Sequence, residues 1–267
     1  MKFLRWISRV VGLRTEDNCL GQVYLLIHRA HTHLQLEEYE RARSLLLEAI
    51  QYRESLDDPG ATSFILSGLD ATYLLTERFN DGIMFFSKYI ARYPEDPDAY
   101  SGRAASLWYT GRFHDAIRDY SRALELKPNH LLSLSGRGQV LAEAGEFRSA
   151  LQDLDLALSI LKTAPAPDAT WTKWYEQIEA FVRNGKGFAL AGLGENASAV
   201  SEFEMSIRLS PENAWVYHNR AQVYERAGDR EAATTDYRLA LTKKSPALSP
   251  LRKKLAEARL SELSRES

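Results

Sequence analysis

Three histidines near the N-terminus are the residues whose spacing could hold a metal ion. His28 and His31 are three positions apart, which places them on one face of a helix, and His33 follows closely. Neutral imidazole is a common ligand of zinc in proteins. No cysteine or acidic residue completes a ligand set at the spacing that zinc sites use. We therefore interpret the three histidines as packing and surface residues and predict no metal site.

Two basic residues flanked by glycines could bind phosphate, because glycine lets an anion approach backbone N–H groups. They are the middle residues of Gly136-Arg137-Gly138 and Gly185-Lys186-Gly187. Both stand at the same place in a repeating helical pattern, which favours a role in helix packing. The phosphate-loop, H-E-x-x-H and G-x-S-x-G motifs do not occur in the sequence. The sequence predicts a non-enzymatic protein without a catalytic site or a cofactor.

A basic and an acidic residue recur together at a constant spacing. The pairs are Arg103 and Asp119, Arg137 and Asp153, Lys186 and Glu202, and Arg220 and Asp236. Both charges are lost together at Leu69 and Phe85, whereas Arg29 lacks an acid because Leu45 stands in its place. We predict that each pair forms an ion pair between helices, which sets their register more than their stability.

The elements that must position these pairs repeat with a period of 34 residues. Gly111, Ala116 and Ala123 recur as Gly145, Ala150 and Ala157, and Gly194 and Ala199 recur as Gly228 and Ala233. A fixed period of this length is typical of stacked repeats, in which each repeat buries its apolar face against its neighbours. The glycines fall between two helices, where a positive φ can end the first one.

The repeat resembles the tetratricopeptide repeat, a helix-turn-helix family of 34 residues. Residues 97–130 carry its pattern in Tyr100, Ala104, Leu107, Gly111, Ala116, Tyr120, Ala123 and Pro128. The second repeat departs from it at Asp70 and Tyr89, where small residues are expected. The repeats are residues 23–56, 63–96, 97–130, 131–164, 180–213 and 214–247. The resemblance implies an all-α fold, a right-handed α-solenoid over residues 23–247. It would consist of about six helix pairs, one for each repeat.

Two insertions interrupt the period. Residues 57–62 carry Asp58, Pro59 and Gly60, and we expect a loop there. Residues 165–179 are the second insertion, and a proline-rich break from Ala164 to Pro167 stands at its start. We expect Asp168 to cap a helix that extends the fifth repeat backward. The aromatic residues of this helix either pack on a neighbouring helix or form a second interface. They are Trp171, Trp174 and Tyr175.

The resemblance also implies the binding surface, because this family binds partners in a concave groove lined by the first helix of each repeat. The residues that we assign to this groove are aromatic or neutral and polar, which suits an apolar or mixed peptide. They are Tyr24, Ile27, His31, Ser101, Trp108, Tyr109, Gln139, Asn184, Phe188, Trp215, His218 and Gln222. The basic residues with which co-chaperones of the family clamp a carboxylate are absent. We therefore expect a scaffold for a protein or peptide partner of unknown identity.

The chain termini fall outside the repeats. Residues 1–22 form a basic N-terminal segment, in which residues 1–14 contain four basic residues, no acid and an amphipathic pattern. This pattern fits a capping helix, a membrane-surface anchor, an organelle presequence or a flexible tail, and the segment could also fold into the groove. Residues 248–267 are expected to form a capping helix and tail, with Ser249 as N-cap and an apolar stripe of Leu251, Leu255, Ala258 and Leu260.

The composition bounds the remaining function classes. The 267 residues are 45% hydrophobic and 26% charged with a net charge of −2, which is ordinary for a folded protein and argues against nucleic-acid binding. Cys19 is the single cysteine, so the chain cannot form an internal disulfide. We expect a cytoplasmic protein, with membrane association through residues 1–14 and homo-oligomerisation left open.

Overall fold

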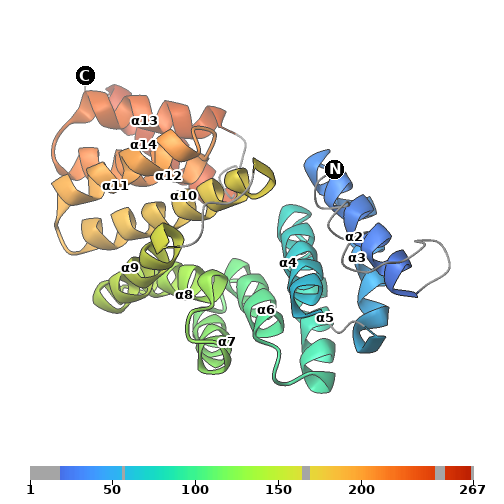
Figure 1. Ribbon diagram of the computed structural model, residues 1–267. Coiled ribbons are helices and arrows are strands. Elements are labelled where there is room, and N and C mark those ends of the chain that lie inside the picture. Colours follow the sequence, from blue (N-terminus) through green and yellow to red (C-terminus); the bar gives the residue numbers. More distant parts are fainter. Residues whose placement is uncertain (1–18, 56–57, 164–168, 244–249, 266–267) are drawn as a thin grey trace. The chain divides into compact units, whose positions relative to one another are not determined.

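The computed structural model describes residues 19–55, 58–163, 169–243 and 250–265. These residues form thirteen α-helices and one short 3-10 helix, and no strand occurs among them (Figure 1). The helices belong to two compact units, Met1–Lys127 and Pro128–Ser267. We call them the N-terminal unit and the C-terminal unit and describe each by itself.

Each unit consists of helix pairs that stack on one another. The N-terminal unit contains α2 (Cys19–Gln35), α3 (Tyr39–Ala49), the 3-10 helix η1 (Ile50–Ser55), α4 (Pro59–Leu75), α5 (Phe79–Arg92), α6 (Pro97–Tyr109) and α7 (Phe113–Leu126). The C-terminal unit contains α8 (Leu131–Glu143), α9 (Phe147–Thr163), α10 (Ala169–Gly192), α11 (Asn196–Leu209), α12 (Ala214–Arg226), α13 (Arg230–Thr242) and α14 (Pro250–Arg265). Within a unit, the first helices of neighbouring pairs contact one another.

The turns inside the pairs use a left-handed residue to end the first helix. Gly111, Gly145, Gly194 and Gly228 have φ values of 78°, 84°, 84° and 80°. The first two pairs place glutamate instead of glycine at this point, with φ values of 59° at Glu37 and 55° at Glu77. The predicted role of the four glycines is confirmed, and the two glutamates carry the backbone strain that glycine avoids.

The expected loop at residues 57–62 is wrong from residue 59 onward, because α4 already begins at Pro59. Asp58 is its N-cap, and the Asp58 side chain accepts a hydrogen bond from the Ala61 backbone N–H at 3.0 Å. Proline fits the first helical position because its missing N–H has no partner there in any case. The residues interpreted as turn chemistry therefore start a helix.

The helix α10 has 24 residues and begins well before the first helices of the other pairs would. This is where we expected a helix extended backward, but its expected cap, Asp168, lies outside the described residues.

The predicted apolar stripe of α14 is partly wrong. Ala256 and Leu263 are buried and Leu260 is half-buried, whereas Leu255 is 48% exposed and Ala258 is exposed. The buried side chains join Ala221, Ala233 and Tyr237 of the last pair in one apolar cluster. The expected cap Ser249 lies outside the described residues, as does the side chain of Leu251.

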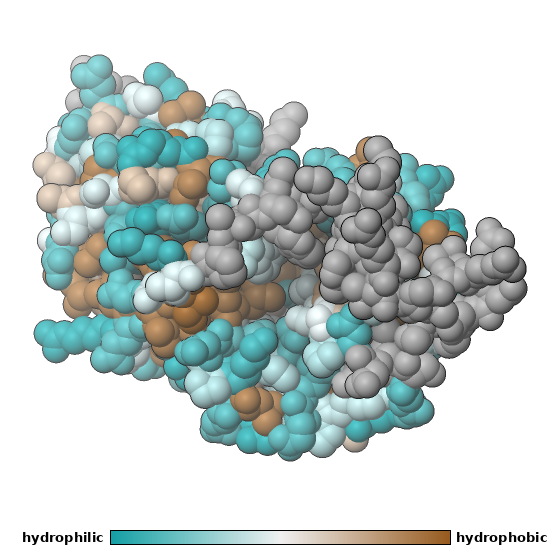
Figure 2. All heavy atoms as spheres, viewed as in Figure 1, coloured by the Kyte–Doolittle hydropathy of each residue, from teal (hydrophilic) through white to brown (hydrophobic). Residues whose placement is uncertain are grey.

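The apolar side chains gather between the helices rather than on the surface. In the N-terminal unit Leu46, Leu66 and Phe86 are fully buried, and in the C-terminal unit Leu154 and Phe203 are. On the face shown in Figure 2, the described residues present mostly hydrophilic side chains, with hydrophobic ones in separate patches.

Candidate functional site

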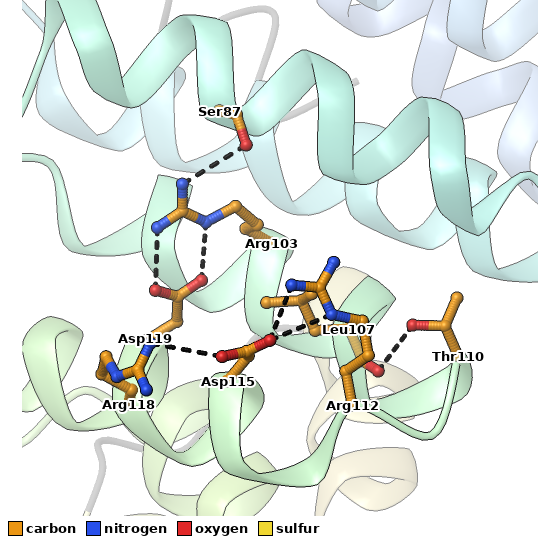
Figure 3. Close-up of polar contacts among 8 residues, drawn as sticks. All are labelled: Ser87, Arg103, Leu107, Thr110, Arg112, Asp115, Arg118 and Asp119. Atoms are coloured by element: carbon orange, nitrogen blue, oxygen red, sulfur yellow. Dashed lines mark hydrogen bonds and ion pairs between the residues drawn. The ribbon is translucent and has the colours of Figure 1, made fainter.

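The four predicted ion pairs all form, each between the two helices of one pair. The Arg103 guanidinium donates to both carboxylate oxygens of Asp119 at 2.6 and 2.8 Å, and also to the Ser87 hydroxyl at 3.3 Å (Figure 3). Arg137 and Asp153 repeat this two-bonded contact at 2.7 and 2.8 Å. These carboxylates are buried, so the rows of charge hold helices together and do not offer an anion site.

The other two pairs lie in the C-terminal unit. Arg220 contacts Asp236 at 2.7 and 2.9 Å. Lys186 Nζ lies 3.2 Å from Glu202, and Arg183 reaches the same carboxylate at 2.8 Å. The prediction of ion pairs between helices is confirmed.

The glycine-flanked basic residues lie inside α8 and α10, where the glycines allow close packing. A Cβ atom at Gly138 would stand 2.6 Å from Leu154 Cγ, and one at Gly187 would stand 2.7 Å from Phe203. A Cβ atom at Gly185 would stand 2.5 Å from the amide nitrogen of Gln139. These helical positions explain the glycines by packing, in agreement with the structural interpretation of both motifs.

The three histidines all lie in α2, and His31 and His33 contact different polar side chains. His33 Nδ1 lies 2.6 Å from Glu38 Oε2, and His31 Nε2 lies 3.0 Å from the Gln35 amide nitrogen. Burial lowers the pKa of His31, and the nearby His28 lowers it further. Among the residues that the structure describes, no three His, Cys, Asp or Glu side chains gather in a way that could hold a metal ion.

The predicted groove residues of the N-terminal unit fall into two groups. Ile27, Ser101 and Trp108 are buried, with Trp108 6% exposed. Tyr109 is 37% exposed and stacks on Phe79 of the neighbouring pair, with ring centroids 5.2 Å apart. Accessible aromatic surface on this unit is therefore supplied by Tyr109 more than by Trp108.

Tyr24 and His31 are half-buried on α2. The Tyr24 hydroxyl donates to Asp58 Oδ2 at 2.6 Å. Burial, together with this hydrogen bond, raises the pKa of Tyr24 to about 12. Tyr24 thus ties α2 to the start of α4, and its assignment to the groove stays a prediction.

The predicted groove residues of the C-terminal unit lie on α8, α10 and α12, the first helices of its three pairs. We call the surface that these three helices form the first-helix face. Phe188, Trp215 and Gln222 are half-buried on it, whereas the other three are buried. The buried residues are Gln139, Asn184 and His218.

The buried polar side chains of this face make hydrogen bonds between helices and within α12. The Gln139 amide donates to the Phe181 carbonyl at 2.7 Å, and the Asn219 amide donates to Asn184 Oδ1 at 3.0 Å. His218 lies 3.3 Å from the Gln222 amide through Nε2, while its buried Nδ1 has no hydrogen-bond partner among the described residues. Burial and the Arg252 charge lower the pKa of His218 to about 4, so this imidazole is neutral at pH 7.

Arg252 of α14 also reaches this face, which the sequence did not indicate. Its guanidinium donates to Glu143 Oε1 at 2.5 Å and to Asn219 Oδ1 at 3.4 Å. Its central carbon lies 4.4 Å from the centroid of the Trp215 ring. Residues of α8, α12 and α14 therefore meet at one point of the C-terminal unit.

The predicted second interface lies at the start of α10. Trp174 and Tyr175 are half-buried and pack edge to face, with ring centroids 5.2 Å apart. The side chain of Trp171 lies outside the described residues. The assignment of these three residues to an interface stays a prediction.

Residues 1–14 also lie outside the described residues, so the hypotheses on the N-terminal segment stay predictions. None of the helices in the described part of the chain combines the length and hydrophobicity needed to span a lipid bilayer.

Comparison with known families identifies the repeat. Residues 97–130 match the tetratricopeptide repeat family, and residues 23–56 and 216–242 match a second profile of the same repeat. No curated protein sequence matches the chain.

Similar solved structures are built from helix pairs of this kind. The Cut9-Hcn1 hetero-tetramer of the APC/C contains a chain that is 15% identical, with a TM-score of 0.72. The match covers 98% of the present chain and 46% of that chain, so the present chain spans about half of its length. A tetratricopeptide repeat protein from Parabacteroides merdae ATCC 43184 is 16% identical with a TM-score of 0.49, over 88% of the present chain and 98% of that one.

At this identity the likeness to the Cut9-Hcn1 structure shows the fold alone, and it agrees with the family matches in three separate stretches of the chain. The predicted fold class, an all-α solenoid of helix pairs, is confirmed. The chain contains tetratricopeptide repeats, which family models match at residues 23–56, 97–130 and 216–242.

Proposed function

We propose that this protein is a non-enzymatic scaffold that binds a segment of a partner protein on the surface formed by the first helices of its pairs. The repeat family and the stacked helix pairs support a protein–protein interaction scaffold.

The observation that carries the proposal is a set of accessible aromatic and amide side chains on the first helices. The first helices carry accessible aromatic and amide side chains, namely Tyr109, Phe188, Trp215 and Gln222. Aromatic side chains with a polar neighbour are the usual anchors of a protein interface, because they bury much area at low entropic cost. The second helices supply the buried carboxylates of the ion pairs, which are already neutralised inside the fold.

The experiment is affinity capture from a lysate of the source cells, with bound proteins identified by mass spectrometry. The test variant is Tyr109→Ala with Phe188→Ala, one change on a first helix of each unit. Trp108 is left intact because it is buried, and its truncation would create a cavity.

The matched control is Met84→Ala with Leu156→Ala, which removes exposed apolar side chains from second helices, again one in each unit. A partner that is lost from the test variant and kept by the control supports the proposed surface. A partner kept by both variants, with far-ultraviolet circular dichroism unchanged, contradicts it.

Membrane tethering through residues 1–14 remains the alternative from the sequence, and cytoplasmic location also stays a prediction. Flotation with liposomes that contain anionic lipid tests the tethering, since binding that survives deletion of residues 1–14 would contradict it.

A further inference from the structure

The guanidinium of Arg252 is surrounded on the first-helix face by a carboxylate, an amide oxygen and an aromatic ring, the groups with which proteins recognise arginine. Glu143 of α8 accepts from its guanidinium, Asn219 of α12 accepts a second hydrogen bond, and the Trp215 ring of α12 lies 4.4 Å from its central carbon. We call Glu143, Trp215 and Asn219 the arginine cradle. All three belong to the C-terminal unit.

The arginine cradle is suited to arginine rather than to any cation. A guanidinium is planar, presents several donors in fixed directions and stacks on aromatic rings, so it can satisfy the carboxylate, the amide oxygen and the ring together. The compact ammonium of lysine cannot make these three contacts at once. With Arg252 in place the Glu143 side chain is 18% exposed, so the guanidinium contacts a carboxylate that is largely shielded from water.

The neighbouring polar residues hold the arginine cradle in place. Asn219 donates its amide hydrogen to Asn184 of α10, which leaves its carbonyl oxygen available to the guanidinium. His218, the preceding residue, is 3% exposed and neutral. The Asn219 acceptor is therefore oriented independently of Arg252, which lowers the entropic cost of binding an arginine there.

The helix α14, which supplies Arg252, buries few apolar side chains against the rest of the unit. Ala256 and Leu263 are its buried apolar side chains in the described part, with Leu260 half-buried, whereas Lys253 and Lys254 are exposed. A helix with so few buried apolar contacts opens at a lower free energy than the pairs beneath it. Its displacement would empty the arginine cradle and leave the repeats intact.

We propose that the arginine cradle binds an arginine side chain of the partner segment, and that Arg252 occupies the cradle as an internal competitor in the free protein. This inference rests on the proposed function, because it names one contact that the partner makes on the first-helix face. The partner is thus a segment that carries arginine. Its apparent affinity is reduced by the fraction of molecules in which Arg252 fills the cradle.

The test uses the full 267-residue chain and a defined probe, the peptide acetyl-Gly-Arg-Gly-amide. Binding is measured by titration, with the tryptophan indole resonances observed by NMR. We expect Arg252→Ala to bind the probe at least about tenfold more tightly than the wild type, since the internal competitor is gone. Adding Glu143→Gln to Arg252→Ala is expected to abolish this gain.

Two controls make the result specific. Lys254→Ala changes an exposed cation of the same helix and should keep the wild-type affinity. The citrulline and lysine counterparts of the probe should bind Arg252→Ala more weakly than the arginine peptide, because one lacks the charge and the other the planar donors. Arg252→Lys, which keeps a cation on α14, should give an intermediate affinity for the probe and guards against misfolding of the alanine variant.

Equal binding of the probe by the wild type and by folded Arg252→Ala and Arg252→Lys would overturn the proposal, as would a gain that persists with Glu143→Gln. Failure of this test leaves the proposed function standing if the Tyr109 and Phe188 variant still loses its partner. Conversely, Arg252→Ala could bind the probe tightly while the captured partner still binds both the Tyr109→Ala, Phe188→Ala variant and its control. That result would support the arginine cradle and contradict the proposed surface.

Discussion

Arg103 and Asp119 meet side-on through two parallel hydrogen bonds of 2.6 and 2.8 Å, one from each of two guanidinium nitrogens (Figure 3). The bonds join the first and second helices of one pair, and the same geometry recurs 34 residues later at Arg137 and Asp153. Because a two-bonded contact is directional, it fixes the rotation of one helix against the other as well as their distance.

Removing Asp119 should therefore be costly. Its side chain is 10% exposed, so Asp119→Ala would leave the Arg103 charge partly buried without its partner. We expect a loss of about 2 to 3 kcal/mol in the free energy of unfolding, measured by urea denaturation. Asp115→Ala is the control, because the arginines that it contacts are exposed, and it should cost far less than Asp119→Ala. Equal losses in the two variants would show that the pair has no special role.

His218 should make stability depend on pH in the acid range. Burial lowers its folded-state pKa to about 4 from 6.5, so the unfolded chain binds a proton at a higher pH than the native protein does. The contribution of neutral His218 to the free energy of unfolding is therefore fully present above pH 6.5. It is lost as the pH falls from 6.5 to about 4, by roughly 3 kcal/mol in total. His218→Gln should be less sensitive to this fall in pH, as followed by urea midpoints at pH 7 and pH 4.5. Parallel pH profiles for the two proteins would contradict the assignment.

Asp70 should act in the opposite direction. Its Oδ1 atom is buried without a hydrogen-bond partner among the described residues, and burial raises the pKa of the carboxyl well above its usual range. Stability is then greatest at low pH and falls as the pH rises from the usual value through the raised one. We expect Asp70→Ala, which restores the small residue of the repeat pattern, to stabilise the protein at pH 7 by about 1 to 3 kcal/mol. If thermal unfolding at pH 7 shows no gain in stability for this variant, the buried Asp70 carboxyl group does not destabilise the fold.

The turns of the first two pairs offer a backbone test. Glu77 has a φ of 55°, so Glu77→Gly should relieve strain and raise the stability by about 1 kcal/mol. The reciprocal change, Gly111→Ala, should lower the stability by about the same amount. A Cβ atom at Gly111 would meet nothing within 4 Å, so that loss reports backbone conformation alone. Both changes can be measured by the shift in the urea midpoint.

The features that depend on the repeat could be predicted from the sequence. The spacing of Arg103 and Asp119 places them on facing sides of two helices in every strict repeat, so their contact follows from the period. Gly111 and its equivalents could be recognised for a similar reason, because they stand where each first helix must end. In both cases the informative partner is nearby along the chain, and the same relation occurs several times.

The features that depend on distant contacts could not be predicted in this way. Gly102 accommodates the Phe86 ring, which a Cβ atom would meet at 2.3 Å, yet the repeat pattern does not ask for glycine at that position. The arginine cradle was missed because Arg252 belongs to a helix outside the repeats and contacts a residue of a different pair. Periodicity contains no information on such contacts, since they occur once.

The separation of Arg252 and Glu143 along the chain has a consequence for biosynthesis. Arg103 and Asp119 are 16 residues apart and can meet as soon as one pair has formed, whereas Arg252 and Glu143 are 109 residues apart. A chain that emerges from the ribosome completes α8 and α12 before α14 exists. During that interval the nascent protein presents Glu143 and Trp215 without Arg252, and a partner that is already present could bind before the competing helix is made.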